Sequence, residues 1–366
     1  FMPKVRRFLD EFETSLLGIS DLGARSGGQI TIASVPTAVF YFLPNAISRF
    51  SIAFPRIRIR ILDLGANEGL EAVGRGEADF GINFIGASHP DIEFTPLAED
   101  PFVVACRHDL MDPTAGPRGY AEGHIPRAWF MHQDTDLAGP KNGRNGRHPL
   151  PDRESMRRRL EAIGVSDDKQ LVVYDAQGGM FAVRLWWLAR WLGHRAVAVL
   201  DGGLPAWARA GFPVTRAAPQ PPAAPGKLSE RPSLAGAVDA AAVLANLSSR
   251  ERLLVDARSP ERYRGETEPL DPVAGHIPGA INRPFQQNLR PDGRFKPAEV
   301  LRQEFEALLG DRAPQQVVHQ CGSGVTGCHN LLAMELAGLA GSFLYPGSWS
   351  EWCADPARPL ATGSEP

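Results

Sequence analysis

Cysteine is scarce in this chain of 366 residues, which contains four: Cys106, Cys321, Cys328 and Cys353. No two of them form a CxxC pair, and no group of histidines has the spacing of metal ligands. Disulfide scaffolds and zinc sites depend on such patterns. We therefore expect neither a disulfide framework nor a bound metal.

Long apolar runs and an excess of one charge are also missing. A membrane-spanning helix needs about 18 or more apolar residues in a row, and a signal peptide needs a basic start before an apolar core. The sequence has neither pattern, so we expect no membrane association and a cytoplasmic location. Its 39 basic and 42 acidic residues give a formal net charge of −3, which provides no electrostatic basis for nucleic-acid binding. Small molecules or proteins are the expected partners.

The N-terminal part of the chain alternates strands with helices, a pattern that implies a parallel sheet. Apolar residues recur at a helical period between Pro3 and Leu22, which predicts an amphipathic helix. The further expected elements are strands at Gln29–Ser34, Arg58–Asp63 and Phe80–Phe84 and helices at Thr37–Phe54 and Gly69–Arg75.

This region carries motifs of a known regulator family, at Gly28–Ala33, Phe54-Pro55 and Gly74–Ile82. On these motifs it resembles the effector-binding domain of LysR-type transcriptional regulators. The resemblance implies an effector cleft near Ser34 and Thr37, although these residues could equally cap the following helix. It also implies that the N-terminal helix is the end of a dimerisation helix, which would allow a homodimer. No helix-turn-helix precedes the region, and the second half of the effector domain is absent, so we expect no direct DNA binding.

Beyond Pro101 the chain is a diverged tandem repeat. Gly123–Pro126 and Gly275–Pro278 both read Gly-His-Ile-Pro, and Asp175 and Cys321 each follow a short strand pattern at matching places. All seven tryptophans lie in this part of the chain, which marks a domain boundary.

One segment begins the repeat and another connects its two copies. A strand expected at Phe102–Asp109 fits either the regulator-like region or the first repeat. We assign it to the repeat because Asp256-Ala257-Arg258 recurs at the matching place in the second copy. The Pro/Ala-rich segment 216–234 predicts an extended, semi-rigid linker between the copies.

The segment around Cys321 has the pattern of a strand, a glycine-rich loop and a helix. The loop reads Cys-Gly-Ser-Gly-Val-Thr at 321–326. Such a loop turns backbone N–H groups and a helix N-terminus toward its first residue, which favours an anion there and hence a thiolate nucleophile. A small buried cysteine at a strand end is the alternative that the loop alone leaves open.

This loop, together with Gly-Ser-Trp-Ser-Glu-Trp at 347–352, resembles the 3-mercaptopyruvate sulfurtransferases of the rhodanese superfamily. The resemblance implies that Cys321 carries a persulfide and that no metal or organic cofactor is needed. In the first copy Asp175 stands at the nucleophile position, and a carboxylate cannot hold sulfane sulfur, so we expect only the second copy to be catalytic. The residues expected to hold the persulfide with their backbone N–H groups are Gly322, Gly324, Val325 and Thr326.

Three polar side chains could handle the proton of the donor. The hydroxyl of Ser323 could relay a proton, or it could bond the loop to itself. Asp134 and His148 of the first copy match residues that, in the family, approach this serine across the domain interface. The resemblance therefore implies a Ser–His–Asp line that tunes the proton on the substrate thiol.

Arg262 and Arg264 follow the strand that ends near Arg258, close to the crevice where α/β proteins bind ligands. The resemblance implies that Arg262 binds the carboxylate of the donor with its planar fork, the alternative being a surface salt bridge. The family's second carboxylate arginine has no clear match, because Leu270 stands in the shortened segment where we would seek it.

The expected function is transfer of sulfur from 3-mercaptopyruvate, through a persulfide on Cys321, to a thiol, cyanide or a thioredoxin-like protein. Thiosulfate sulfurtransferase activity is the first alternative, although Ser323 and Gly324 are neutral where such enzymes carry cationic residues. Phosphatase chemistry is disfavoured, because it needs a longer loop that ends in arginine, whereas this loop ends at Thr326. A non-catalytic, effector-sensing regulatory protein is the second alternative, and an N-terminal segment without function is a third.

The predicted fold class is α/β: tandem rhodanese domains, each a parallel sheet flanked by helices, preceded by an α/β half-domain of LysR-type effector-binding, periplasmic-binding-protein-like fold. The expected boundaries are 1–100 for the half-domain, 101–215 for an inactive rhodanese domain, 216–234 for the linker and 235–362 for a catalytic rhodanese domain.

Overall fold

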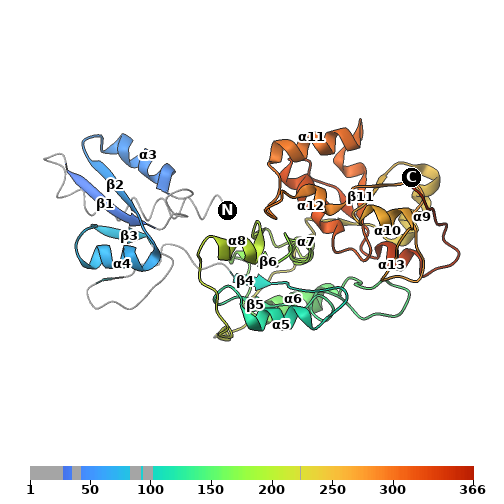
Figure 1. The fold of residues 1–366 in the computed structure, drawn as a ribbon, viewed down its shortest axis with the longest axis horizontal. Coiled ribbons are helices and arrows are strands. Elements are labelled where there is room, and N and C mark those ends of the chain that lie inside the picture. Colours follow the sequence, from blue (N-terminus) through green and yellow to red (C-terminus); the bar gives the residue numbers. More distant parts are fainter. Residues whose placement is uncertain (1–27, 35–42, 83–91, 94–101, 223) are drawn as a thin grey trace. The chain divides into compact units, whose positions relative to one another are not determined.

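The computed structural model describes residues 28–34, 43–82, 92–93, 102–222 and 224–366 (Figure 1). The chain divides into two compact units, Phe1–Asp100 and Pro101–Pro366. The amphipathic helix expected at Pro3–Leu22 lies outside the described residues, as does Thr37. Among the described residues, every helix is too short or too polar to span a lipid bilayer.

The first unit contains a three-stranded parallel sheet in the order β2-β1-β3. Ile32 in the central strand pairs with Ile61 on one side and with Phe80 on the other. Strands lie at all three predicted places within the described residues, which end at Ile82 for the third. The described part of the first predicted helix ends one residue earlier than expected, and the second predicted helix begins three residues earlier. The elements are β1 (Gln29–Ser34), α3 (Leu43–Ala53), β2 (Arg58–Asp63), α4 (Ala66–Gly74) and β3 (Phe80–Ile82).

Opposite faces of this sheet are covered by α3 and α4 (Figure 1). On one face, Phe50 of α3 lies in a cluster with Ile30 and Ile32. On the other face, Ala72 of α4 packs with Ala33. The alternation of side chains along β1 explains this arrangement, because neighbouring residues of a strand point to opposite faces.

The first half of the second unit is a four-stranded parallel sheet in the order β5-β4-β6-β7. Strand β4 pairs with β5 and β6, which confirms its assignment to the repeat, although it ends at Ala105 rather than at Asp109. The strands are β4 (Phe102–Ala105), β5 (Trp129–Phe130), β6 (Leu171–Tyr174) and β7 (Val197–Val199), and the helices are α5 (Ala115–Glu122), α6 (Arg153–Ala162), α7 (Ala182–Trp191) and α8 (Gly203–Arg209).

The second half repeats this plan with a five-stranded parallel sheet in the order β10-β9-β11-β12-β8. Strands β6 and β11 occupy equivalent central places, and the loops after them begin at Asp175 and Cys321, as the repeat predicts. The elements are β8 (Gly236–Ala237), α9 (Ala240–Ser249), β9 (Leu253–Asp256), α10 (Pro260–Arg264), β10 (Ala280–Asn282), η1 (Phe285–Asn288), α11 (Ala298–Leu309), η2 (Pro314–Gln316), β11 (Val317–Gln320), α12 (Gly327–Leu336), β12 (Phe343–Leu344) and α13 (Ser348–Trp352).

The two halves share one hydrophobic core. Trp187 of α7 and Met334 of α12 belong to the same cluster of buried residues, and these two helices pack together. An ion pair of 2.9 Å between Arg190 and Glu335 joins the same helices. Loops after the two central strands are therefore held close to each other.

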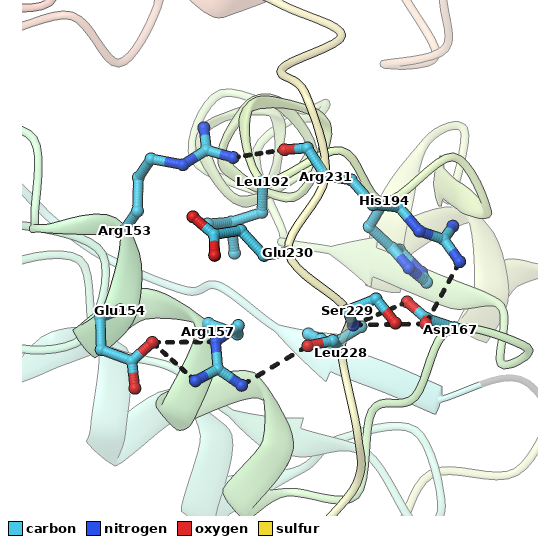
Figure 2. A pocket seen from close by; sticks show the side chains of 10 residues that line it. All are labelled: Arg153, Glu154, Arg157, Asp167, Leu192, His194, Leu228, Ser229, Glu230 and Arg231. Atoms are coloured by element: carbon cyan, nitrogen blue, oxygen red, sulfur yellow. Dashed lines mark hydrogen bonds and ion pairs between the residues drawn. The ribbon is translucent and has the colours of Figure 1, made fainter.

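The linker between the halves lies against the first of them. Leu228 is buried, and its backbone N–H donates to a carboxylate oxygen of Glu161 at 2.9 Å. A cavity of about 140 Å³ lies between this segment and α6 (Figure 2). None of the residues predicted to take part in sulfur transfer lines it.

Candidate active site

The loop at 321–326 is shaped by glycine and clamped by the segment that leads into α13. Gly324 has a φ of +74°, and a Cβ there would collide with the carbonyl oxygen of Pro346. The hydroxyl of Ser348 accepts the N–H of Cys321 at 3.1 Å, and the N–H of Trp349 donates to the carbonyl of Cys321 at 2.9 Å. The motif at 347–352 therefore holds the first residue of the loop at 321–326 in place.

The first copy shows what a loop of this shape can hold. Both carboxylate oxygens of Asp175 accept hydrogen bonds from the backbone, at distances between 2.8 and 3.0 Å. Four N–H groups thus converge on one anion at the position equivalent to Cys321. The donors are the N–H groups of Gln177, Gly179, Phe181 and Ala182.

In the second copy most of the corresponding donors remain available, although the N–H of Cys328, the counterpart of Ala182, donates to the carbonyl of Val325 at 3.1 Å. Among the residues that the structure describes, the N–H groups from Gly322 to Gly327 have no hydrogen-bond acceptor. They include the first N–H group of α12, that of Gly327, and the N-cap residue Thr326 makes no side-chain cap. Backbone donors of this kind stabilise negative charge at a helix N-terminus. Gly322, Gly324, Val325 and Thr326, which we expect to hold the persulfide, all lie in this loop.

The thiol of Cys321 is shielded from water and is surrounded by apolar groups. Only 2% of the residue is exposed. It lies in a small cluster with Ala257 and Phe285, against which Met180 of the first copy packs. A low-dielectric surrounding strengthens every electrostatic interaction with the sulfur.

Cys328, seven residues further along, has a different environment. Burial raises the pKa of its thiol to about 12, so the thiol stays protonated at neutral pH. Its Sγ donates to the carbonyl of Gly324 at 3.3 Å. The residue packs inside α12 and supports the loop, in agreement with its expected packing role.

The structure brings Ser323, His148 and Asp134 into one line across the two copies. Nδ1 of His148 lies 2.7 Å from the hydroxyl of Ser323, and Nε2 lies 3.3 Å from a carboxylate oxygen of Asp134. Because an ionised carboxylate only accepts, the imidazole proton belongs on Nε2. Nδ1 is then free to accept the proton of the serine hydroxyl.

Burial sets the charge state of this line. It lowers the pKa of His148 to about 4, and Asp134 only partly opposes this effect. The pKa of Asp134 is itself held below its usual range, chiefly by the hydrogen bond from His148 and also by Lys141, whose ammonium lies 2.9 Å away. At neutral pH the line therefore consists of a carboxylate and a neutral imidazole.

His108 and His132 surround Asp134 on its other side, and the three could together offer ligand atoms to a metal. Both ring nitrogens of His132 are already used, one by the N–H of Asp134 and the other by the carbonyl of Pro113. The ammonium of Lys141 also competes for the carboxylate. These contacts fit a support for Asp134 better than a metal site.

Arg262 reaches the loop, whereas Arg264 does not. The guanidinium of Arg262 lies beside Gly322 and is paired with two buried carboxylates, Glu268 at 2.7 Å and Asp271 at 3.4 Å. Arg264 instead forms a surface ion pair of 2.6 Å with Glu266. The structure therefore places only Arg262 beside the loop, because residues two apart on a helix point in different directions.

Two further arginines at the site, Arg147 and Arg184, were missed by the sequence interpretation. Arg184 of α7 is completely buried, and its two terminal nitrogens donate to the carbonyls of Gly324 and His148, both at 3.0 Å. No carboxylate of a described residue pairs with it. Burial lowers its pKa, an effect opposed by the nearby thiols of Cys328 and Cys321, but a guanidinium stays charged.

The sequence did hold a signal for each of them. Arg184 interrupts the otherwise apolar run Ala-Val-Arg-Leu-Trp-Trp-Leu-Ala at 182–189, and charged residues in such runs are buried only for a reason. Arg147 directly precedes His148, so any fold that brings His148 to Ser323 also brings Arg147 to the loop. Its guanidinium forms an ion pair with Asp271 and lies beside Gly322.

The fold and the site define a tandem rhodanese protein with one cysteine-bearing loop and one carboxylate-bearing loop. The family model of the rhodanese-like domain matches residues 97–210 and 239–355, which is more than half of the chain. The chain therefore belongs to the rhodanese-like family. Residues 23–122 also match the model of the LysR substrate binding domain.

Relatives with assigned names agree with this placement. The chain is 49% identical over 266 residues to the "probable 3-mercaptopyruvate sulfurtransferase" of Pseudomonas aeruginosa, covering 72% of this chain and 93% of that protein. It is 38% identical to thiosulfate sulfurtransferase of Bos taurus, over 64% of this chain and 78% of that one. Among solved structures, 3-mercaptopyruvate sulfurtransferase from Leishmania major matches with a TM-score of 0.60 and 29% identity, over 69% and 70% of the two chains.

Proposed function

We propose that this chain is a sulfurtransferase that takes sulfur from 3-mercaptopyruvate onto Cys321 and passes it to a thiol or to cyanide. One observation carries the proposal. Cys321 begins a loop whose equivalent in the first copy already holds an anion with four backbone N–H groups. The N–H groups of the second loop can hold a persulfide anion in the same way.

The first half of the reaction needs one bond exchange and one proton transfer. The thiolate of Cys321 attacks the sulfur of the donor, the C–S bond of the donor breaks, and its electron pair goes to carbon. The proton of the donor thiol passes through Ser323 and His148 to that carbon, which gives pyruvate and leaves a persulfide anion on Cys321. Atoms and charge balance without a redox partner.

The second half returns the enzyme to its starting state. An acceptor thiolate or cyanide attacks the outer sulfur of the persulfide, and the thiolate of Cys321 leaves. We propose small thiols, cyanide or a thioredoxin-like protein as acceptors, because the reaction needs only a sulfur or carbon nucleophile. We further propose that the segment 101–215 is an inactive domain that lends Asp134 and His148 to the catalytic domain at 235–362.

Thiosulfate is the second candidate donor. The relative in Bos taurus carries that name, and the arginines around the loop suit an anion. The loop side chains at Ser323 and Gly324 are neutral, however, and thiosulfate has no proton for His148 to move. The Ser–His–Asp line therefore favours a thiol donor.

Comparing pyruvate release from 3-mercaptopyruvate with sulfite release from thiosulfate tests the proposal directly. We expect a higher kcat/KM for 3-mercaptopyruvate, and a mass increase of one sulfur atom on Cys321 after either donor is added without an acceptor. A preference for thiosulfate would overturn the donor assignment while leaving the nucleophile in place. Absence of persulfide on Cys321 with both donors would overturn the enzymatic function.

A further inference from the structure

Two guanidinium groups converge on the backbone of Gly322, the residue directly after Cys321. A Cβ placed on Gly322 would lie 2.8 Å from Nη2 of Arg147 and 3.3 Å from both Nη1 and Nη2 of Arg262. Glycine therefore lets two cations approach the backbone beside the nucleophile more closely than a side chain would allow. A side chain at this position would displace the guanidinium of Arg147.

Both guanidinium groups keep N–H donors that no described residue of the protein uses. Arg147 uses Nη1 for its ion pair with Asp271, and Arg262 uses Nε and Nη2 for Glu268 and Asp271. Nη2 of Arg147 and Nη1 of Arg262 have no acceptor in the part of the chain that the structure describes. The two side chains are 24% and 16% exposed, respectively, so a small ligand can reach them.

The position of Arg147 is built by the contact between the two copies. The N–H of Arg147 donates to the hydroxyl of Ser350 at 3.0 Å. The preceding Gly146 has a φ of +83°, and a Cβ there would lie 2.9 Å from the carbonyl oxygen of Gly347. At the other end of the side chain, the buried carboxylate of Asp271 holds the guanidinium. Arg147 is thus fixed at both ends against the second copy.

We propose that Arg147 and Arg262 form one clamp for the carboxylate of the sulfur donor, with Arg147 supplied by the inactive copy. The inference rests on the proposed function and specifies its donor as a small thiol-bearing acid. Two carboxylate oxygens can accept one N–H from each arginine, and the planar fork of each guanidinium suits this geometry. Arg147 provides the second cation, which is missing at Leu270, the place where the family's second carboxylate arginine would be sought.

The first test compares two donors in the Arg147→Gln variant. For 3-mercaptopyruvate we expect KM to rise about 10- to 100-fold, the loss of one charge-assisted hydrogen bond, with little change in kcat. For 1-mercaptopropan-2-one, which has a methyl group in place of the carboxylate, kcat/KM should stay within about twofold of the parent enzyme. Arg147→Lys keeps the charge without the fork, so its KM for 3-mercaptopyruvate should lie between those of the parent enzyme and of Arg147→Gln.

Arg144→Gln is the matched control, since Arg144 is exposed in the same loop and its side chain makes no hydrogen bond or ion pair with a described residue. It should leave KM for 3-mercaptopyruvate unchanged. An equal loss for both donors in Arg147→Gln would show that Arg147 only maintains the structure through Asp271, and an unchanged KM for 3-mercaptopyruvate would show that Arg147 does not contact the donor. Either result overturns the clamp.

A second test does not depend on turnover. Binding of pyruvate to the Cys321→Ser variant, measured by calorimetry, should weaken about 10- to 100-fold when Arg147 is also changed to glutamine. If 3-mercaptopyruvate proves not to be a donor, this comparison still decides whether the clamp exists. Pyruvate affinity that does not depend on Arg147 would overturn the clamp even if the sulfurtransferase is active.

Discussion

Nδ1 of His148, in the first copy of the repeat, lies 2.7 Å from the hydroxyl oxygen of Ser323, in the second. This single contact places a proton acceptor of one copy on the loop of the other. The buried guanidinium of Arg184 crosses the same boundary to the carbonyl of Gly324. The copy that carries Asp175 at the nucleophile position therefore still supplies side chains to the site.

The contact predicts that His148 and Ser323 act as one unit. His148→Ala and Ser323→Ala should each lower kcat with 3-mercaptopyruvate by about 100-fold or more, the usual contribution of a positioned general base. The double variant should lose little more than either single variant, because both remove the same proton path. Steady-state rates of pyruvate release measure all three.

Thiosulfate provides the control for this comparison of single and double variants, since its sulfur carries no proton. Sulfite release should fall much less in both single variants than pyruvate release does. Additive losses in the double variant, or equal losses with the two donors, would mean that the contact only holds the loop in shape.

Cys321 and Cys328 should differ completely in reactivity. Cys321→Ser should abolish persulfide formation, because a hydroxyl in its place is a far weaker nucleophile. Cys328→Ala should keep the activity, because the thiol of Cys328 has its pKa raised to about 12 and is packed inside α12. Intact-protein mass spectrometry after treatment with 3-mercaptopyruvate distinguishes the two. Loss of persulfide in Cys328→Ala, with an unchanged unfolding curve, would contradict this assignment.

The sequence could predict what depends on a local pattern. The strand, loop and helix around Cys321 follow from residues that are close together in the chain, and the twin loop at Asp175 follows from the repeat. The pairing of His148 with Ser323 required a family resemblance, because 175 residues separate the two. Arg147 was not found, although it directly precedes His148, because the direction of its side chain toward Gly322 depends on how the two copies dock. That Arg264 lies away from the loop was not foreseen, because a spacing of two does not reveal which way each side chain points.

Buried histidines should make the protein less stable in mild acid. Burial lowers the pKa of His319 to about 3 and of His329 to about 4, from an ordinary value of 6.5. Between about pH 6.5 and 4 the unfolded chain therefore binds more protons than the folded one, so stability falls as the pH falls. Each such histidine contributes a slope of about 1.4 kcal/mol per pH unit in this window.

His319→Leu provides a direct measurement of that slope. Nδ1 of His319 has no hydrogen-bond partner among the described atoms, and Nε2 contacts only the sulfur of Met334 at 3.1 Å, so an apolar side chain should be tolerated. We expect the free energy of unfolding, from urea titrations between pH 4.5 and 7, to depend less steeply on pH by about 1.4 kcal/mol per unit. An unchanged slope would mean that His319 is already protonated in the folded protein.

The charge of Arg184 should make Cys321 more reactive. The guanidinium is buried without a carboxylate partner in the described chain, and its charge interacts with the thiols of Cys321 and Cys328. Replacing it by methionine removes a cation from a low-dielectric site, which disfavours the thiolate. Arg184→Met should slow the alkylation of Cys321 by iodoacetamide at neutral pH by about tenfold or more, the equivalent of at least 1.4 kcal/mol.

Arg184→Lys separates charge from shape in the same experiment. Lysine keeps the cation but cannot donate to the carbonyls of both Gly324 and His148 as the fork of arginine does. If charge is what matters, alkylation in Arg184→Lys should stay close to the parent rate, even where the free energy of unfolding falls as much as in Arg184→Met. Equal slowing of alkylation in the two variants would instead mean that Arg184 holds Gly324 and His148 in place. The lost hydrogen bonds, rather than the lost charge, would then account for the lower reactivity of Cys321.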